Sequence, residues 1–203
     1  MTENMPTPTP TASNRGDADA ILDVVLHLLE DGGDEGLQLR QVAKQARVSL
    51  STVYKYFPSR DELVIAAVER WMAERVYASL PVVGPEEPLP DRLTRWFGQL
   101  LAPWKEQPNM LRIFMRAALL PGGQRLARQG ERAIGTSAEH LFDSEDPAFT
   151  ADVAMILTNV IQGLLSRFAI GEIEMSEVAA ELERTIHRLA DGVPAQQAAL
   201  AND

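Results

Sequence analysis

Residues 36–60 restrict the possible folds of this chain most strongly, because they combine an unusual charge pattern with two short helical signals. The segment reads GLQLRQVAKQARVSLSTVYKYFPSR and holds five basic residues and no Asp or Glu, in a protein of formal net charge −10. Leu39, Val42, Ala43 and Ala46 recur at i, i+3, i+4 and i+7. This spacing predicts a short amphipathic helix at the start of the segment.

A second short helix is expected after a turn at Arg47-Val48. Ser49 can cap it, because the serine hydroxyl accepts a hydrogen bond from a backbone N–H that the first turn leaves unpaired. This helix keeps Val53 and Phe57 for the core and exposes mainly hydroxyl-bearing and cationic side chains. Two short helices joined by a tight turn, the second of them cationic, are typical of a helix-turn-helix.

The run VSLSTVYKYFPSRDEL resembles the DNA-binding signature of TetR-family transcriptional regulators. The aromatic residues Tyr54, Tyr56 and Phe57, then a basic residue, an acid and Leu63, stand at the spacing of that family. The resemblance implies an all-α fold of about nine helices, with a three-helix head and a C-terminal helical bundle. It also implies that the head contacts double-stranded DNA through Arg40, Leu50, Ser51, Thr52, Tyr54, Lys55, Tyr56 and Arg60. We expect Ser51, Thr52 and the 54–56 side chains in the major groove, and Arg40 and Arg60 on phosphates.

Two positions depart from the family pattern. The residue before Val48 is commonly Gly, which adopts a left-handed backbone without penalty. Arg47 in that conformation would cost about 1 kcal/mol. The first motif helix commonly begins with Thr or Ser, whereas this chain has Gln38-Leu39 and so offers no capping hydroxyl there.

Charge is distributed unevenly along the 203 residues. Residues 1–35 hold one basic and eight acidic side chains, residues 36–60 five and none, and residues 61–203 thirteen and twenty-one. A cationic face on an acidic body suits phosphate docking while limiting non-specific adhesion. The alternative is a solvated helix face that happens to be basic.

Composition limits the cellular setting. The chain has no cysteine, and therefore no disulfide or thiol chemistry, and its N-terminus lacks the features of a signal peptide. No run of 18 uncharged apolar residues exists, so no membrane span is expected. These features predict a cytoplasmic protein with no membrane contact.

The rest of the chain reads as helices separated by Pro and Gly. We expect a disordered tail at 1–14, a helix-turn-helix domain at 15–60, a sensing and dimerisation domain at 61–192, and a mobile tail at 193–203. Helices are predicted over 17–31, 61–80, about 93–103, 108–120, within 122–142, from Pro147 to near Gly171, and from a cap at Ser176. The four prolines of 81–90 predict a loop.

No catalytic, metal or cofactor site is expected. The histidines, His27, His140 and His187, are scattered, and none has a partner at metal-ligand spacing. Carboxylate pairs such as Glu86-Glu87 lie in loops without an apolar wall that would raise a pKa. The sequence therefore favours a protein that is not an enzyme and binds no cofactor.

The body contains aromatic and methionine side chains that suit either a filled core or an apolar ligand pocket. The second interpretation gives the ligand-binding set Trp96, Leu100, Trp104, Met110, Phe114, Met115, Ala118, Asn159 and Gln162. Asn159 and Gln162 share one helix face with Ser166. These polar groups would orient a ligand, bond across a dimer interface or face water, and the sequence does not choose among the three.

The pattern as a whole predicts a one-component transcriptional regulator, most often a repressor in the family it resembles. It would bind a palindromic operator as a homodimer and be released by a small, largely apolar effector. Its body also resembles the branch of TetR-like regulators that controls sterol catabolism in actinobacteria. The alternatives are a DNA-binding regulator without an effector, and a helical protein whose basic face binds an acidic partner.

Overall fold

The computed structural model describes residues 12–84, 86–138, 140–142 and 145–200, and for 12–15, 136 and 191–200 it describes the backbone alone. This part of the chain folds into nine α-helices with no strand among them, which confirms the all-α prediction. The helices are α1 Ala12–Gly32, α2 Leu39–Gln45, α3 Leu50–Tyr56, α4 Arg60–Trp71, α5 Leu89–Glu106, α6 Pro108–Ala118, α7 Gln124–Ala138, α8 Pro147–Ala169 and α9 Met175–Leu200.

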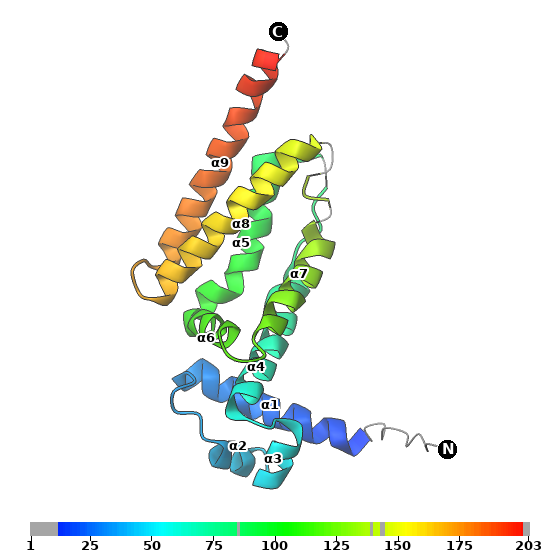
Figure 1. Cartoon of the computed structure of the whole chain (residues 1–203), viewed down its shortest axis with the longest axis vertical. Coiled ribbons are helices and arrows are strands. Elements are labelled where there is room, and N and C mark those ends of the chain that lie inside the picture. Colours follow the sequence, from blue (N-terminus) through cyan, green and yellow to red (C-terminus); the bar gives the residue numbers. More distant parts are fainter. Residues whose placement is uncertain (1–11, 85, 139, 143–144, 201–203) are drawn as a thin grey trace, which may run out of the picture.

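The molecule is elongated, with a small head and a larger body (Figure 1). Helices α1, α2 and α3 gather at one end, α4 leads from them into the body, and α8 and α9 lie side by side far from the head. The head core forms because α1 places Ile21, Val25 and Leu29 on one stripe, where all three are fully buried. Val42 of α2 and Val53 of α3 complete that core.

The turn and the caps of the head follow the sequence closely. Arg47 has φ 57°, so an arginine does adopt the left-handed backbone that favours glycine. Ser49 caps α3, since its Oγ accepts a hydrogen bond from the Thr52 N–H at 3.0 Å. Ser59 caps α4 in the same way, accepting from the Glu62 N–H at 3.1 Å. These caps fix where α3 and α4 begin.

The predicted helix over 61–80 is not a single α-helix. After Trp71 the backbone widens into a π-helical turn, Met72–Val76, and then tightens into a 3₁₀ turn, Tyr77–Ser79. Met72 and Val76 are buried while Ala73, Glu74 and Arg75 face outward. The segment that connects head and body therefore ends in two turns whose backbone hydrogen bonds do not follow the α-helical pattern.

Pro103 does not end its helix as expected. It lies inside α5, which begins at Leu89, within the predicted loop, and continues to Glu106. Proline removes one backbone donor from a helix interior. The next residue, Trp104, is buried with its ring centroid 4.8 Å from that of Trp71 and 5.5 Å from that of Phe114. This aromatic packing keeps the last turn helical.

Both ends of the chain are more helical than predicted. Helix α1 already begins at Ala12, so the expected disordered tail is wrong for 12–14, and residues 1–11 lie outside the described part. Helix α9 starts at Met175, so Ser176 is not its cap. Instead, the Glu177 carboxylate accepts a hydrogen bond from the Glu174 N–H at 2.8 Å. The same helix continues to Leu200, through most of the tail expected at 193–203, and residues 201–203 are not described.

Helix α8 has one buried and one open face. Its buried stripe is Val153, Leu157, Ile161, Leu164 and Phe168, and it packs against α9. On length and composition α8 could cross a membrane, yet core helices of globular proteins pass the same test. In the single chain only 17% of the most apolar 18-residue stretch of α8 is buried. Much of the apolar surface of α8 is therefore uncovered in the monomer.

Candidate nucleic-acid interface

Helix α3 presents a polar outer face and an apolar inner face. Ser51, Tyr54 and Lys55 are exposed, and 48% of Tyr54 is accessible to solvent. Leu50, Thr52 and Tyr56 are half-buried, while Val53 and Phe57 belong to the core. The residues predicted to face the major groove therefore share one helix, but they divide into exposed ones and ones that also support the head.

The hydroxyl groups at the start of α3 form a small cluster. Ser49 Oγ lies 2.7 Å from Ser51 Oγ and 2.7 Å from Thr52 Oγ1, in addition to its bond with the Thr52 N–H. Ser49 Oγ uses its one donor and both lone pairs in these three contacts, whereas the hydroxyl oxygens of Ser51 and Thr52 retain acceptor capacity. The cap therefore also orients two of the side chains predicted to contact DNA.

Tyr56 lies between the exposed face and α1. Its ring is half-buried, and burial, followed by the negative charge of Asp17 on α1, raises the pKa of its hydroxyl. Lys55 Nζ lies 5.6 Å from the centroid of the Tyr56 ring, within reach of a cation–π contact. Tyr56 is thus neutral at physiological pH, and it packs against the core while bordering the outer face of α3.

Three cations around α2 are available for phosphates. Arg40, Lys44 and Arg47 are all exposed, and in the described part of the chain none of them forms an ion pair with an acid. Arg40 was predicted as a phosphate contact. Lys44 and Arg47 were not predicted as phosphate contacts. Both belong to the block 36–60 that contains no acid, and this charge pattern could have indicated them.

Arg60, for which a phosphate contact was predicted, forms hydrogen bonds within the head. Its Nη2 donates to the backbone carbonyl of Asp34, and its Nε donates to the carbonyl of Leu37 at 3.4 Å. These bonds direct the guanidinium toward the loop between α1 and α2. The sequence could not reveal this, because the partners lie more than twenty residues upstream.

The predicted ligand-binding residues separate into two places. Trp96, Trp104 and Met110 are buried, and Leu100, Phe114, Met115 and Ala118 are half-buried in the same body core. The Trp96 indole N–H donates to Ser137 Oγ at 2.9 Å. These residues therefore form packed core rather than the wall of an open cavity in the present conformation.

Asn159 and Gln162 do not join this cluster. Both are exposed on α8, on faces that point away from its buried stripe, and the Asn159 side-chain amide donates to the Met155 carbonyl one turn earlier, at 2.8 Å. In the single chain both therefore lie on the outer surface, and their assignment to the ligand set stays a prediction. Their periodicity was read correctly, but periodicity alone does not say what a helix face meets.

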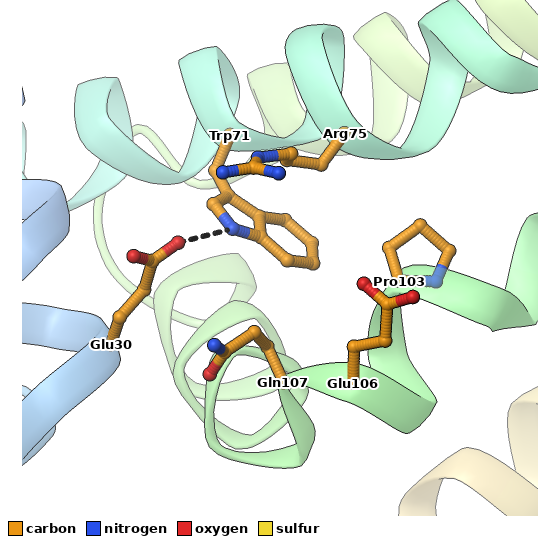
Figure 2. A pocket seen from close by; sticks show the side chains of 6 residues that line it. All are labelled: Glu30, Trp71, Arg75, Pro103, Glu106 and Gln107. Atoms are coloured by element: carbon orange, nitrogen blue, oxygen red, sulfur yellow. Dashed lines mark hydrogen bonds between the residues drawn. The ribbon is translucent and has the colours of Figure 1, made fainter.

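Two cavities lie near α4, and none of the predicted ligand residues lines either of them. The first has a volume of about 80 Å³ and lies where α1, α4 and the end of α5 meet (Figure 2). Its lining residues are Glu30, Trp71, Arg75, Pro103, Glu106 and Gln107. Figure 2 shows the Trp71 indole N–H donating to the Glu30 carboxylate, at 3.1 Å, which ties α4 to α1.

The second cavity is an open groove of about 470 Å³ between the π and 3₁₀ turns and α7. It is lined by Ala73, Tyr77, Ala78, Gln129, Arg132 and Ala133. Burial raises the pKa of Tyr77 to about 12, so its hydroxyl is a hydrogen-bond donor in the groove wall at any physiological pH. Among the described residues, no group of three or more His, Asp or Glu side chains is arranged to hold a metal ion.

Comparison with known proteins identifies both parts of the chain. The family described as bacterial regulatory proteins, tetR family, matches residues 21–67, which span most of α1 through α4. The family described as tetracyclin repressor-like, C-terminal domain, matches residues 87–189. Among curated proteins, the HTH-type transcriptional repressor KstR of Rhodococcus jostii is 28% identical over 174 residues, which is 83% of this chain and 80% of KstR.

Solved structures share the fold. A TetR-family regulator from Streptomyces coelicolor has a TM-score of 0.67 at 21% identity, covering 93% of this chain and 87% of that one. The multidrug binding protein EbrR, complexed with imidazole, has a TM-score of 0.62 at 22% identity, covering 88% of this chain and 90% of its own. A head with a capped α3, a helical body and two matching family regions lead to one conclusion. The chain belongs to the TetR family of bacterial transcriptional regulators.

Proposed function

We propose that the protein is a one-component repressor that binds a palindromic operator as a homodimer and releases it when a small, largely apolar ligand binds the body. The observation that carries the DNA-binding part is the outer face of the head. There, Ser51, Tyr54 and Lys55 project from a capped helix, beside cations on α2 that have no acidic partner in the described part of the chain.

In this proposal α3 enters the major groove and α2 supports it on the phosphate backbone. A lysine can bond the O6 and N7 acceptors of guanine, and serine, threonine and tyrosine hydroxyls can bond several base edges. Arg40, Lys44 and Arg47 are placed to neutralise phosphates, which gives affinity but little sequence information. The acidic remainder of the chain repels phosphate and so favours docking through this one face.

The homodimer is supported by the uncovered surface of α8. Met155 of α8 is 58% exposed, Ile170 directly after α8 is 79% exposed, and α8 also presents Asn159 and Gln162. A second copy of the chain, related by a two-fold axis, would cover this surface and let these amides bond across the interface. Helices α8 and α9 would then form the contact, at the end of the molecule away from the head (Figure 1).

In this proposal the effector binds within the core of the body. EbrR, a relative in fold, was solved with imidazole and with proflavin. In this chain a ligand would enter by displacing side chains around Trp104 and Phe114, where Met115 can adapt its shape. The packed state of that cluster favours the second candidate function, a repressor controlled by its own concentration alone.

These two candidates differ in how they answer apolar compounds. Phe114→Ala removes part of the aromatic cluster, so a true sensor should change its response to an inducer while its operator affinity stays nearly constant. If no apolar metabolite shifts the melting temperature or releases DNA from the wild-type protein, the sensor proposal fails.

We further propose that the protein acts in the cytoplasm and is not an enzyme, in keeping with its family.

Selection of bound fragments from genomic DNA tests the DNA-binding proposal directly. Purified protein should enrich fragments that share one inverted repeat, and a synthetic duplex with that repeat should bind in a salt-dependent manner. Enrichment of fragments without a common repeat, or binding that ignores salt concentration, would contradict the proposal.

A further inference from the structure

The start of α2 lacks the usual means of fixing a helix end. Gln38 occupies the N-cap position, and its side chain makes no capping hydrogen bond. The first N–H groups of a helix are unpaired unless a side chain satisfies them, and a helix of seven residues has little stability of its own. Some other contact must therefore hold the loop at 33–38 that leads into α2.

Arg60 supplies the first such contact. It begins α4 and reaches back to donate to the carbonyls of Asp34 and Leu37. The Asp34 carbonyl also accepts from the Leu37 N–H at 3.2 Å, which closes a turn immediately before the N-cap. A planar guanidinium that bonds two carbonyls of one turn fixes that turn more firmly than a single bond would.

Arg116 supplies the second contact, and it comes from the body. It lies in the last turn of α6, and its Nη2 bonds the Asp34 carboxylate. Its Nη1 also lies 3.8 Å from Glu35 Oε1. The Asp34 side chain is 16% exposed and that of Arg116 is 48% exposed, so the pair is partly shielded from water. Nearby, the Asn109 amide of α6 donates to the Leu29 carbonyl at 3.4 Å.

We infer that Asp34 is a positioning residue for operator binding, an inference that rests on the proposed DNA-binding function. One residue meets a cation from the head through its carbonyl and a cation from the body through its carboxylate. The loop before α2 is thereby fixed to α6, and with it the angle between the helix-turn-helix and the body. Arg60 serves this junction instead of a phosphate.

The angle matters because a dimer reads two half-sites at once. The body of each protomer sets where its head lies, so a head fixed to α6 gives one separation between the two copies of α3. A head held to α6 by fewer contacts samples a wider range of separations. It should then bind a correctly spaced operator less tightly and discriminate less against operators with one base pair inserted or removed.

Arg116→Gln is the main test variant, because it removes the ion pair at a half-exposed side chain without opening the core. Arg116→Lys keeps the charge and serves as the rescue. Arg95→Gln breaks the exposed Arg95–Glu87 pair, 2.9 Å long, which does not join head and body, and serves as the matched control. The probes are the operator recovered by genomic selection and duplexes with its half-sites one base pair closer or farther, measured by fluorescence anisotropy.

We expect Arg116→Gln to lower the ratio of dissociation constants between mis-spaced and correct operators by about two- to thirtyfold, the range typical of residues that couple sites. Arg116→Lys should restore most of the ratio, and Arg95→Gln should leave it unchanged. Equal ratios in wild type and Arg116→Gln would overturn the inference. If the wild-type protein selects no DNA at all, the failure belongs to the proposed function instead.

Arg60→Gln separates the positioning role from direct phosphate binding. The salt slope is the slope of the logarithm of the binding constant against the logarithm of the salt concentration. Replacing a side chain that binds a phosphate reduces the magnitude of this slope by about one. Replacing a positioning residue leaves the slope at its wild-type value while weakening binding to the correct operator. A slope lowered by about one would show that Arg60 contacts a phosphate, and would contradict its positioning role at Asp34.

Discussion

Ser49 offers the sharpest test of how the head is built, because one hydroxyl both caps α3 and orients its neighbours. In Ser49→Ala the Thr52 N–H loses its partner at 3.0 Å, and the hydroxyls of Ser51 and Thr52 lose theirs at 2.7 Å. Removing a serine cap costs about 1 kcal/mol. The two hydroxyl–hydroxyl bonds are exposed, so water replaces them and they add little to stability. The expected fall in melting temperature is about 2–4 °C for a chain of this size.

The effect on DNA binding should be larger than this decrease in stability suggests. Ser51 and Thr52 become free to rotate, and ordering them again on the operator costs about 0.5–1.5 kcal/mol in each head. Operator affinity should therefore fall about fivefold for one head and more for the dimer. Thermal unfolding followed by circular dichroism gives the first quantity, and fluorescence anisotropy with the selected operator gives the second.

Ser59→Ala is the matched control, since Ser59 caps α4 with a single bond of similar length, 3.1 Å, and has no other hydroxyl partner in the described structure. It should lower the melting temperature by a similar amount and change operator affinity much less. Equal decreases of operator affinity in the two variants would show that the hydroxyl cluster does not prepare α3 for DNA binding.

Three further predictions concern Lys55, the proposed dimer surface and pH. Lys55→Ala should weaken operator binding by about 1–2 kcal/mol and reduce the salt slope by about one; an unchanged slope would remove Lys55 from the interface. Met155→Glu places a charge on the open face of α8, so analytical ultracentrifugation should show the sedimenting dimer replaced by monomer at micromolar concentration, with Glu131→Gln on the exposed side of α7, outside the proposed contact, as a control; a persistent dimer would move the interface elsewhere. The pKa of Tyr77 is raised to about 12, above that of an unfolded tyrosine, so its contribution to stability is complete below pH 10 and is lost as pH rises toward 12. Tyr77→Phe should remove this part of the alkaline decline in unfolding free energy, and a decline of the same size in both proteins would assign it to other groups.

The sequence predicted those features of the fold that depend on near neighbours. The two motif helices, the turn at Arg47 and the cap at Ser49 all follow from residues within four positions of one another. The helices expected over 17–31 and from Pro147 to near Gly171 are present as α1 and α8 for the same reason, since a helix repeats its faces every three or four residues. Local rules sufficed here because the tertiary structure agrees with them.

Features that depend on distant residues were missed. The hydrogen bonds of Arg60 were not predicted, because its partners lie on a loop that only the tertiary fold brings near. Pro103 was expected to end a helix, and aromatic packing against Trp71 overrides that local preference. The π turn at Met72–Val76 has no signal in the sequence that we can identify.

Of the two predicted sites, only the DNA-binding face could be outlined from the sequence, and the ligand pocket could not. The outer face of α3 could be outlined from composition, since a run of hydroxyls and cations without acids is visible in one dimension. A ligand pocket cannot be outlined in this way, because whether Trp96 or Phe114 lines a cavity or fills a core depends on the helices opposite it. Asn159 illustrates the limit: its helix face was predicted, but not that this face is uncovered in the monomer.

The stoichiometry and symmetry of the operator complex test the central claim most directly. Native mass spectrometry of the protein with a duplex carrying the selected inverted repeat should show two chains on each duplex. Scrambling one half-site should abolish tight binding, since a single head with its few cations binds weakly. One chain bound to each duplex, with equal affinity for the intact repeat and for a single half-site, would contradict the account of this protein as a dimeric operator-binding regulator.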